Sequence, residues 1–327
     1  MTDFTADELE AHVAARGLVY PRDLLAEVVA ALDSGQHVLL TGAPGTGKTA
    51  LAYAVADLAR DAVRCTGYVA ATASADWGEG QTVGQYTHTP EGLVFQPGVF
   101  LDAIDSGRWL LIDELNRANI DRAFGPLFTV LSEQAVSLHY KRAGRTEPIS
   151  IVPAGAEPPP HTDVHSVPRH WRIVATMNDV DQASLHRLSY ALMRRFAFIE
   201  VPTVSDEHLR TLVRGGGGLV AELFPVREFV RLGPAIFISA ARFAARRLAD
   251  LDVSQSRVLF EAFFAFVLPQ LGQLDSHQVR QLFDALAPRF DPIEAELLER
   301  AIRNSIGVPT YTPHRRSGPR APTAPAT

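Results

Sequence analysis

The sequence predicts a doubly wound α/β domain followed by an all-helical domain, and three observations carry this prediction. Apolar runs without alternation recur along residues 37–201, which is typical of strands buried on both faces of a parallel sheet. Helical patterns separate these runs, as the crossovers of a parallel sheet require. After residue 201 the strand pattern stops, and the apolar residues follow helical spacing only.

The composition fits a folded protein with one large or two modest domains. The 327 residues are 46% hydrophobic and 21% charged, and the formal net charge is −6. This charge argues against a protein that coats nucleic acid over its whole surface, although a local basic pore would be invisible in the sum. Cys65 is the single cysteine, which excludes an intramolecular disulfide and fits a reducing compartment.

We expect neither a membrane span nor a signal peptide. The chain has no uncharged apolar run of about 18 residues, the length that a membrane helix needs. Residues 1–8 are acidic and lack the apolar stretch of a signal peptide. We therefore expect a cytoplasmic protein.

The pattern along the chain divides it into four parts. Residues 1–36 form an N-terminal helical segment, 37–201 an α/β core, 202–306 a helical lid domain, and 307–327 a disordered proline-rich tail. The core strands are expected at 37–41, 62–66, 109–113, 171–177 and 196–201, which makes a five-stranded parallel sheet. Core helices are expected at 50–60, 98–104 and 119–133. Two inserts are expected at about 67–98, with a hairpin near 82–95, and at about 134–170.

A glycine-rich loop follows the first strand and precedes a helix. It consists of Gly42, Ala43, Pro44, Gly45, Thr46, Gly47, Lys48 and Thr49. The glycines let the backbone curl so that successive N–H groups point at a phosphate, and the helix N-terminus adds a partial positive charge. Lys48 can reach the β- and γ-phosphates of a bound nucleotide, and the Thr49 hydroxyl can ligate Mg²⁺. The loop therefore predicts a binding site for a nucleoside triphosphate.

Polar residues end the third and fourth strands. Asp113 and Glu114 close one apolar run, and Asn178 closes the next. The carboxyl ends of neighbouring parallel strands meet at one edge of the sheet, where α/β ligands bind. We expect Asp113 to hold Mg²⁺ beside Thr49, Glu114 to polarise the attacking water as the base, and Asn178 to orient that water.

Two arginines precede the last strand, at the edge of the sheet opposite the phosphates. Arg194 and Arg195 should not reach the nucleotide of their own subunit, but they could reach that of a neighbour. An arginine supplied across an interface stabilises the charge of a transferring phosphoryl group. We expect Arg195, with Arg194 as the second candidate, to act in this way.

These motifs resemble those of the AAA+ ATPases, and within them the MoxR- and McrB-like branch. The resemblance covers residues 42–201. It is carried by GAPGTGKT (42–49), LLIDELNRAN (110–119), ATMN (175–178) and SYALMRRFAFIEV (189–201). It implies a P-loop NTPase fold with a helical lid, ATP and Mg²⁺ as cofactors, and a ring, usually hexameric, with nucleotide at the subunit interfaces. It also implies that both inserts face a pore or a partner.

The chain departs from this branch where a sensor 2 arginine is usual. Alanine stands in the corresponding region, Gly233-Pro234-Ala235, and neither Arg231 nor Arg242 can be assigned to the role.

The function expected from the resemblance is that of a MoxR-like ring ATPase that remodels or regulates a partner protein. A von Willebrand A-type factor or a nuclease subunit is the implied partner, and neither is encoded in this chain. Two alternatives stay open. One is a GTP- or ATP-driven motor of an McrB-like DNA restriction system, disfavoured because only 41 residues precede Gly42 and the net charge is acidic. The other is a nucleotide-gated scaffold with little turnover.

Overall fold

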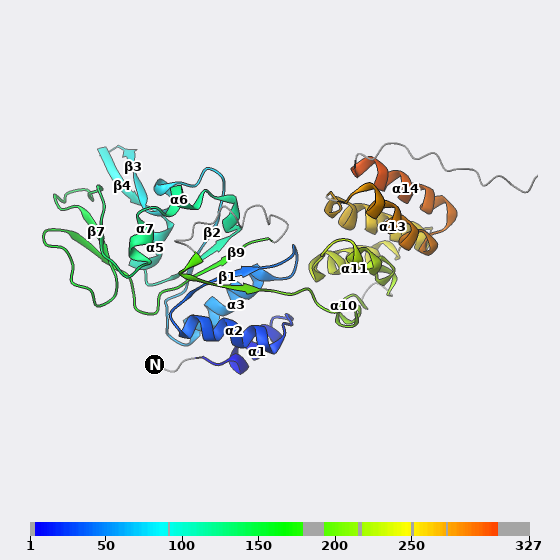
Figure 1. Cartoon of the computed structure of the whole chain (residues 1–327), viewed down its shortest axis with the longest axis horizontal. Coiled ribbons are helices and arrows are strands. Elements are labelled where there is room, and N and C mark those ends of the chain that lie inside the picture. Colours follow the sequence, from blue (N-terminus) through cyan, green and yellow to red (C-terminus); the bar gives the residue numbers. More distant parts are fainter. Residues whose placement is uncertain are drawn as a thin grey trace, which may run out of the picture. The chain divides into compact units, whose positions relative to one another are not determined.

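The computed structural model describes residues 4–90, 92–178, 193–214, 218–249, 252–272 and 274–306. The chain divides into two compact units (Figure 1). The first comprises Met1–Leu209 with Arg231–Ala235, and the second comprises Arg210–Val230 with Ile236–Thr327. Within the described ranges, no helix combines the length and the apolar character needed to cross a membrane.

A five-stranded parallel sheet forms the centre of the first unit, as the sequence predicts. Its strands, in spatial order, are β10 (Phe196–Glu200), β1 (His37–Thr41), β9 (Ile173–Thr176), β5 (Trp109–Asp113) and β2 (Tyr68–Thr72). Because all five strands run in the same direction, the residues that follow β1, β5 and β9 lie at one edge. This edge therefore carries the glycine-rich loop, Glu114 and Asn178.

Helices cover both faces of this sheet and create two separate cores (Figure 1). On one face lie α1 (Ala6–Ala14), α2 (Arg22–Asp33) and α3 (Lys48–Asp61). On the other face lie α5 (Val99–Asp105), α6 (Ile120–Phe124) and α7 (Leu127–Val130). Successive strand residues alternate between the two cores, as Leu110 and Leu111 do. Both sets are buried, which explains why the strands read as unbroken apolar runs.

The second strand lies later in the chain than the sequence predicts. A strand at residues 62–66 is wrong, because α3 continues to Asp61 and the chain then turns, with Val63 at a φ of 58°. The strand that pairs with β5 is β2, whose residues Tyr68–Thr72 are in register with Trp109–Asp113. Both segments carry apolar and β-branched residues, so only the long-range pairing with β5 distinguishes them.

The single helix predicted at 119–133 is two short helices, α6 and α7. Gly125 and Pro126 separate them. Pro126 has no N–H to continue the hydrogen-bond ladder, and its ring crowds the carbonyl one turn earlier.

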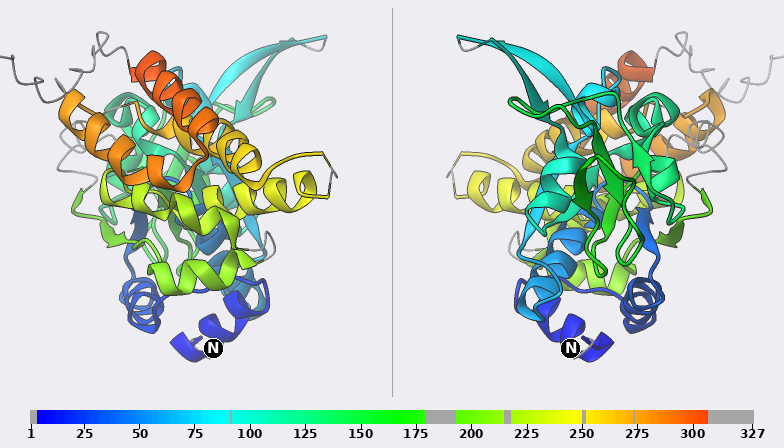
Figure 2. Two further views of the ribbon diagram at one scale, coloured as in Figure 1. Left: turned by 90° about the vertical axis from the view of Figure 1, so that its right-hand side faces the viewer. Right: turned by 90° about the vertical axis from the view of Figure 1, so that its left-hand side faces the viewer.

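Two inserts interrupt the first unit, one between β2 and α5 and the other between α7 and β9. The first contains α4 (Glu79–Thr82) and an antiparallel hairpin of β3 (Gly84–Thr89) and β4 (Gly92–Pro97), which projects well away from the sheet (Figure 2). The second contains a small sheet of β6 (Val136–Ser137), β7 (Ile149–Val152) and β8 (Asp163–Ser166). The predicted hairpin near 82–95 is thus confirmed, and its insert begins after β2.

The second unit is helical throughout its described residues, as predicted for the C-terminal part of the chain. Its elements, with the connecting helix α10, are α10 (Asp206–Leu212), η4 (Leu219–Glu228), α11 (Pro234–Arg247), α12 (Gln255–Ala262), η5 (Phe263–Val267), η6 (Leu268–Gln270), α13 (Ser276–Leu286), η7 (Ala287–Arg289) and α14 (Pro292–Ile306). The proposed tail, 307–327, and residues 189–192 of the arginine segment lie outside the described residues. The domain boundaries expected from the sequence remain a proposal.

Candidate functional site

The glycine-rich loop connects the end of β1 to the first residue of α3, Lys48. Three of its glycines have left-handed backbone angles: the φ of Gly42 is 142°, that of Gly45 is 77° and that of Gly47 is 92°. Side chains at these positions would also meet neighbours. A Cβ on Gly42 would lie 2.5 Å from the carbonyl oxygen of Val201. The loop thus needs glycine for its angles and for its packing.

Lys48 is buried, with only 6% of its surface exposed. Its ammonium donates hydrogen bonds to the carbonyl oxygens of Gly42 at 2.8 Å and Ala43 at 2.9 Å. It also donates to Oδ1 of Asn178 at 2.8 Å. The buried cation is therefore solvated by the loop that it serves and by the residue after β9.

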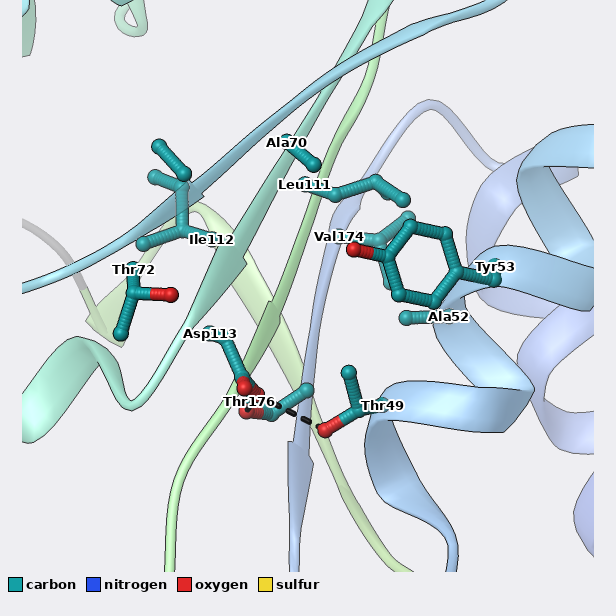
Figure 3. A pocket seen from close by; sticks show the side chains of 11 residues that line it. Thr49, Ala52, Tyr53, Ala70, Thr72, Leu111, Ile112, Asp113, Val174 and Thr176 are labelled. Carbon is teal, nitrogen blue, oxygen red and sulfur yellow. Dashed lines mark hydrogen bonds between the residues drawn. The ribbon is translucent and has the colours of Figure 1, made fainter.

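A cluster of oxygen atoms lies beside Lys48 at the start of α3. The Thr49 hydroxyl donates to Oδ1 of Asp113 at 2.8 Å, and the Thr176 hydroxyl donates to the same oxygen at 2.5 Å. The three side chains form the polar end of a cavity of about 170 Å³ that also includes Thr72 and Tyr53 (Figure 3). Hydroxyl and carboxylate oxygens are the ligands that Mg²⁺ prefers, so Thr49 and Asp113 fit such an ion.

Glu114 has a left-handed backbone, with a φ of 56° and a ψ of 45°. For a residue with a Cβ this conformation costs about 1 to 2 kcal/mol. Its N–H donates to the Thr176 hydroxyl at 3.1 Å, and its Oε1 accepts from Nδ2 of Asn178 at 2.5 Å. Its Oε2 lies 3.6 Å from Nε of Arg117. The turn thus places the carboxylate of Glu114 against Asn178.

Asn178 bridges the loop and the acidic pair. Its oxygen faces the ammonium of Lys48, and its nitrogen faces the carboxylate of Glu114. This orientation of the amide is the only one in which both contacts are hydrogen bonds, because an ammonium only donates and a carboxylate only accepts. Side chains from three elements, which the sequence predicts at one edge, therefore form a continuous chain.

The two arginines lie at the opposite edge of the sheet. Arg195 immediately precedes β10, and its carbonyl accepts the N–H of His37 at the start of β1. Arg195 also donates to the Ser132 hydroxyl, whereas Arg194 is exposed. A five-residue strand at about 3.3 Å per residue separates these arginines from the loop at the end of β1 by roughly 16 Å. They do not join the cluster of their own chain.

Two further contacts support the loop, and sequence reasoning missed both. The buried Tyr20 hydroxyl donates to the carbonyl oxygen of Gly47 at 2.8 Å, and burial raises the pKa of this phenol. The second contact comes from the segment that begins α11. The N–H of Gly233 donates to Pro44 at 3.0 Å, and that of Ala235 donates to Gly45 at 3.2 Å.

The segment Gly233-Pro234-Ala235, where the resemblance implies a sensor 2 arginine, therefore contacts the loop through its backbone. A Cβ on Gly233 would lie 2.1 Å from the carbonyl carbon of Gly45, so only glycine allows this approach. Arg231 lies 3.5 Å from Glu200, and Arg242 is exposed on α11. The glycine before Pro234 was the available sequence signal for the close contact, although a proline-adjacent glycine more often marks a simple turn.

The family comparison covers the same segment as this site. Residues 37–196 match the model of a family described as AAA domain (dynein-related subfamily). This segment is an AAA+ domain. It extends from the first residue of β1 to the first residue of β10, and so includes the loop, Asp113, Glu114 and Asn178. The chain is accordingly an ATPase, and it binds ATP.

Other comparisons add little. Among solved structures, the AAA+ chain is similar to NtrX from Brucella abortus, determined in complex with ATP. The sequence identity is 15% and the TM-score 0.46, over 92% of this chain and 73% of that one. A likeness this distant carries no conclusion about the present site. No protein of curated function matches the sequence.

Proposed function

We propose that this AAA+ ATPase is a Mg²⁺-dependent ring of the MoxR- and McrB-like branch that remodels or regulates a partner protein. One observation carries the proposal. Lys48, Asn178 and Glu114 form a continuous chain of hydrogen bonds beside the Thr49–Asp113 pair. Phosphate binding, metal binding and water activation therefore lie within one connected group of side chains.

The loop and Lys48 bind the triphosphate in this proposal. Backbone N–H groups of residues 42–49 and the N-terminus of α3 provide donors and a partial positive charge. Lys48 exchanges its contacts with the carbonyl oxygens of Gly42 and Ala43 for phosphate oxygens. The exchange replaces one set of oxygen ligands by another, so the buried ammonium is never left unsolvated.

Thr49 and Asp113 would hold the Mg²⁺ ion. Their oxygens already face one another at 2.8 Å, and they are of the hard type that this ion binds. When bound, the ion neutralises charge on the phosphate oxygens.

Glu114 acts as the base for the attacking water, and Asn178 orients it. The carboxylate of Glu114 only accepts hydrogen bonds, so it can take a water proton, and Asn178 holds it in place through Nδ2. Release of Lys48 toward phosphate would free Oδ1 of Asn178 to accept from the water.

The positions of Arg194 and Arg195 support a shared site. Each lies at the edge of the sheet away from the loop of its own chain, so a second copy must supply the arginine that faces the triphosphate. AAA domains assemble into oligomers in general, and we propose a hexameric ring here. Arg195, with Arg194 as the second candidate, acts across the interface.

The partner is proposed to be a separate protein, either a von Willebrand A-type factor or a nuclease subunit. The β3–β4 hairpin and the β6–β8 sheet are the surfaces proposed to face it or the pore. Both inserts leave the central sheet without taking part in the nucleotide cluster.

The decisive experiment is steady-state phosphate release by the Glu114→Gln variant. The amide keeps the size of the side chain but cannot accept a proton, so we expect turnover to fall at least 100-fold. Binding of ATP, measured with a fluorescent analogue, should change less than about threefold because Lys48 and the loop are intact. Glu27→Gln, on the exposed face of α2, is the matched control and should hydrolyse ATP normally. Unchanged turnover in Glu114→Gln would remove this residue from the mechanism.

A second experiment identifies the preferred nucleotide. Competition of GTP against ATP for binding, with and without DNA, measures the base preference. A preference for GTP, together with tighter nucleotide binding in the presence of DNA, would contradict the proposed role and favour a DNA motor.

A further inference from the structure

We propose that Thr176 is the positioning residue of the hydrolytic centre, because its single hydroxyl holds both Asp113 and Glu114. This proposal rests on the proposed function, in which Asp113 serves the metal and Glu114 the water. Thr176 is the last residue of β9, and only 3% of its surface is exposed. It lies two residues before Asn178, on a different strand from the acidic pair.

The hydroxyl uses both of its hydrogen-bonding capacities on adjacent residues. Its proton is donated to Oδ1 of Asp113, and its lone pair accepts the N–H of Glu114 at 3.1 Å. A hydroxyl is the smallest side-chain group that can donate and accept at once. One oxygen atom therefore sets the rotamer of the first carboxylate and the backbone of the second.

Glu114 needs such an anchor because its backbone is left-handed, at a φ of 56°. This conformation is unfavourable for a residue with a Cβ, and it persists only where the surroundings enforce it. It is also what turns the carboxylate away from the direction of β5 and toward Asn178. Loss of the anchor would let the turn relax toward the ordinary region, and the carboxylate would leave Asn178.

Thr49 makes the second hydroxyl contact to Oδ1 of Asp113 (Figure 3). The two contacts have different fates in the proposed mechanism. Thr49 is itself a proposed metal ligand, so its hydroxyl is shared with the ion. Thr176 has no such second task, and it stays on Asp113 and Glu114 throughout the cycle.

The test compares three variants of the full chain. Thr176→Val keeps the β-branched shape but removes the hydroxyl, and Thr176→Ser keeps the hydroxyl but removes the methyl group. Thr72→Val is the matched control: Thr72 lines the same cavity from β2, opposite Asp113 in the register, and it is exposed. Each variant is measured for kcat, for KM, and for affinity toward a fluorescent ATP analogue without Mg²⁺.

We expect kcat of Thr176→Val to fall about 10- to 100-fold, the loss typical of a misplaced reacting group. Its metal-free nucleotide affinity should stay within about twofold, because the loop and Lys48 are intact. Thr176→Ser should keep kcat within about threefold of the original chain, and Thr72→Val should be unchanged. A normal kcat in Thr176→Val would overturn the proposal, and so would a kcat in Thr176→Ser as low as that in Thr176→Val. A loss of metal-free nucleotide affinity in Thr176→Val as large as its loss of kcat would also overturn it.

Amide hydrogen exchange supplies a readout that is independent of hydrolysis. The Glu114 N–H should be protected in the original chain and should exchange at least about tenfold faster in Thr176→Val, with no such change in Thr72→Val. Fast exchange of this amide in the original chain would by itself defeat the proposal, even if Thr176→Val did not fold. If the original chain hydrolysed no ATP but its Glu114 N–H were protected, the proposed function would be wrong, whereas the contact between Thr176 and Glu114 would still hold.

Discussion

His37 begins β1 inside an aromatic environment. Its ring centroid lies 5.7 Å from that of Trp171 and 5.3 Å from that of Phe196, and its Nδ1 accepts the N–H of Ile173 at 3.0 Å. Burial, with a smaller contribution from Arg172, lowers the pKa of this imidazole to about 3. The ring therefore stays neutral in the folded protein and serves as an acceptor between two strands.

This neutral ring should make the first unit sensitive to acid. The unfolded chain binds a proton at His37 near its ordinary pKa of 6.5, whereas the folded chain does not until about pH 3. Stability from this group is therefore complete above pH 6.5 and declines as the pH falls toward 3, by up to about 1.4 kcal/mol per unit. His37→Asn keeps an acceptor for Ile173 and removes the titration, so its loss of stability between pH 7.5 and 5 should be smaller by about 2 kcal/mol.

Urea unfolding followed by tryptophan fluorescence measures this difference. The three tryptophans, Trp77, Trp109 and Trp171, all belong to the first unit, so their signal reports that unit alone. Equal acid sensitivity in the variant and the original chain would show that His37 does not contribute.

The residues of the site illustrate what a sequence can predict at this scale. Lys48, Asp113 and Asn178 were predicted to meet because each follows or begins an element at the same edge of a parallel sheet. The contacts of Tyr20 and Thr176 were not predicted, since both depend on where a hydroxyl points once distant segments pack together. The left-handed backbone of Glu114 was equally hidden, because glutamate gives no local signal for it.

At the level of elements, the segment Arg231–Ala235 belongs with the AAA+ core although it follows a stretch of the helical unit. Its two backbone hydrogen bonds end on the carbonyl oxygens of Pro44 and Gly45. The start of α11 thus braces the glycine-rich loop.

Gly233→Ala should disturb this brace. The new methyl carbon would lie 2.1 Å from the carbonyl carbon of Gly45, so the segment or the loop must move. We expect the Kd for ATP to rise at least about tenfold, measured with a fluorescent analogue. Gly272→Ala is the matched control, because a methyl group there meets nothing within 4 Å. Equal affinities in the two variants would mean that the loop keeps its shape without the brace.

The positions of helices and strands were predicted well where the local apolar pattern determines them, and poorly where pairing with a distant strand determines them. The strands β1, β5, β9 and β10 follow the predicted apolar runs. The strand β2 was misplaced because residues 62–66 have a similar composition, and only its partner β5 distinguishes the two segments. Pro126 was a sequence signal for a helix break, and it divides α6 from α7 although the apolar residues on both sides follow helical spacing.

At the scale of the whole molecule, the proposed ring makes the activity depend on assembly. Arg195 contacts Ser132 within its own chain and lies away from its own loop. A solitary subunit would lack the arginine that faces its triphosphate, so specific activity should fall steeply on dilution below the assembly concentration.

Mixing of two inactive variants tests this dependence. Arg195→Ala lacks the arginine but keeps its loop, and Lys48→Ala lacks the cation proposed to bind phosphate but keeps its arginine. Each should lose at least about 100-fold in turnover alone, and a mixture should regain part of it because a Lys48→Ala copy can serve the loop of an Arg195→Ala copy. Ser132→Ala removes the hydrogen bond between Ser132 and Arg195 without removing the charge, and it should remain active. Full activity of a dilute monomer, or no recovery on mixing, would contradict the shared site.

Within the protein, the ammonium of Lys48 donates hydrogen bonds to two carbonyl oxygens and one amide oxygen. These partners offset the cost of burying a charged ammonium at the start of α3. In the proposed mechanism a triphosphate must displace these oxygen atoms, so its net affinity reflects the difference between two sets of hydrogen-bond partners for one charge.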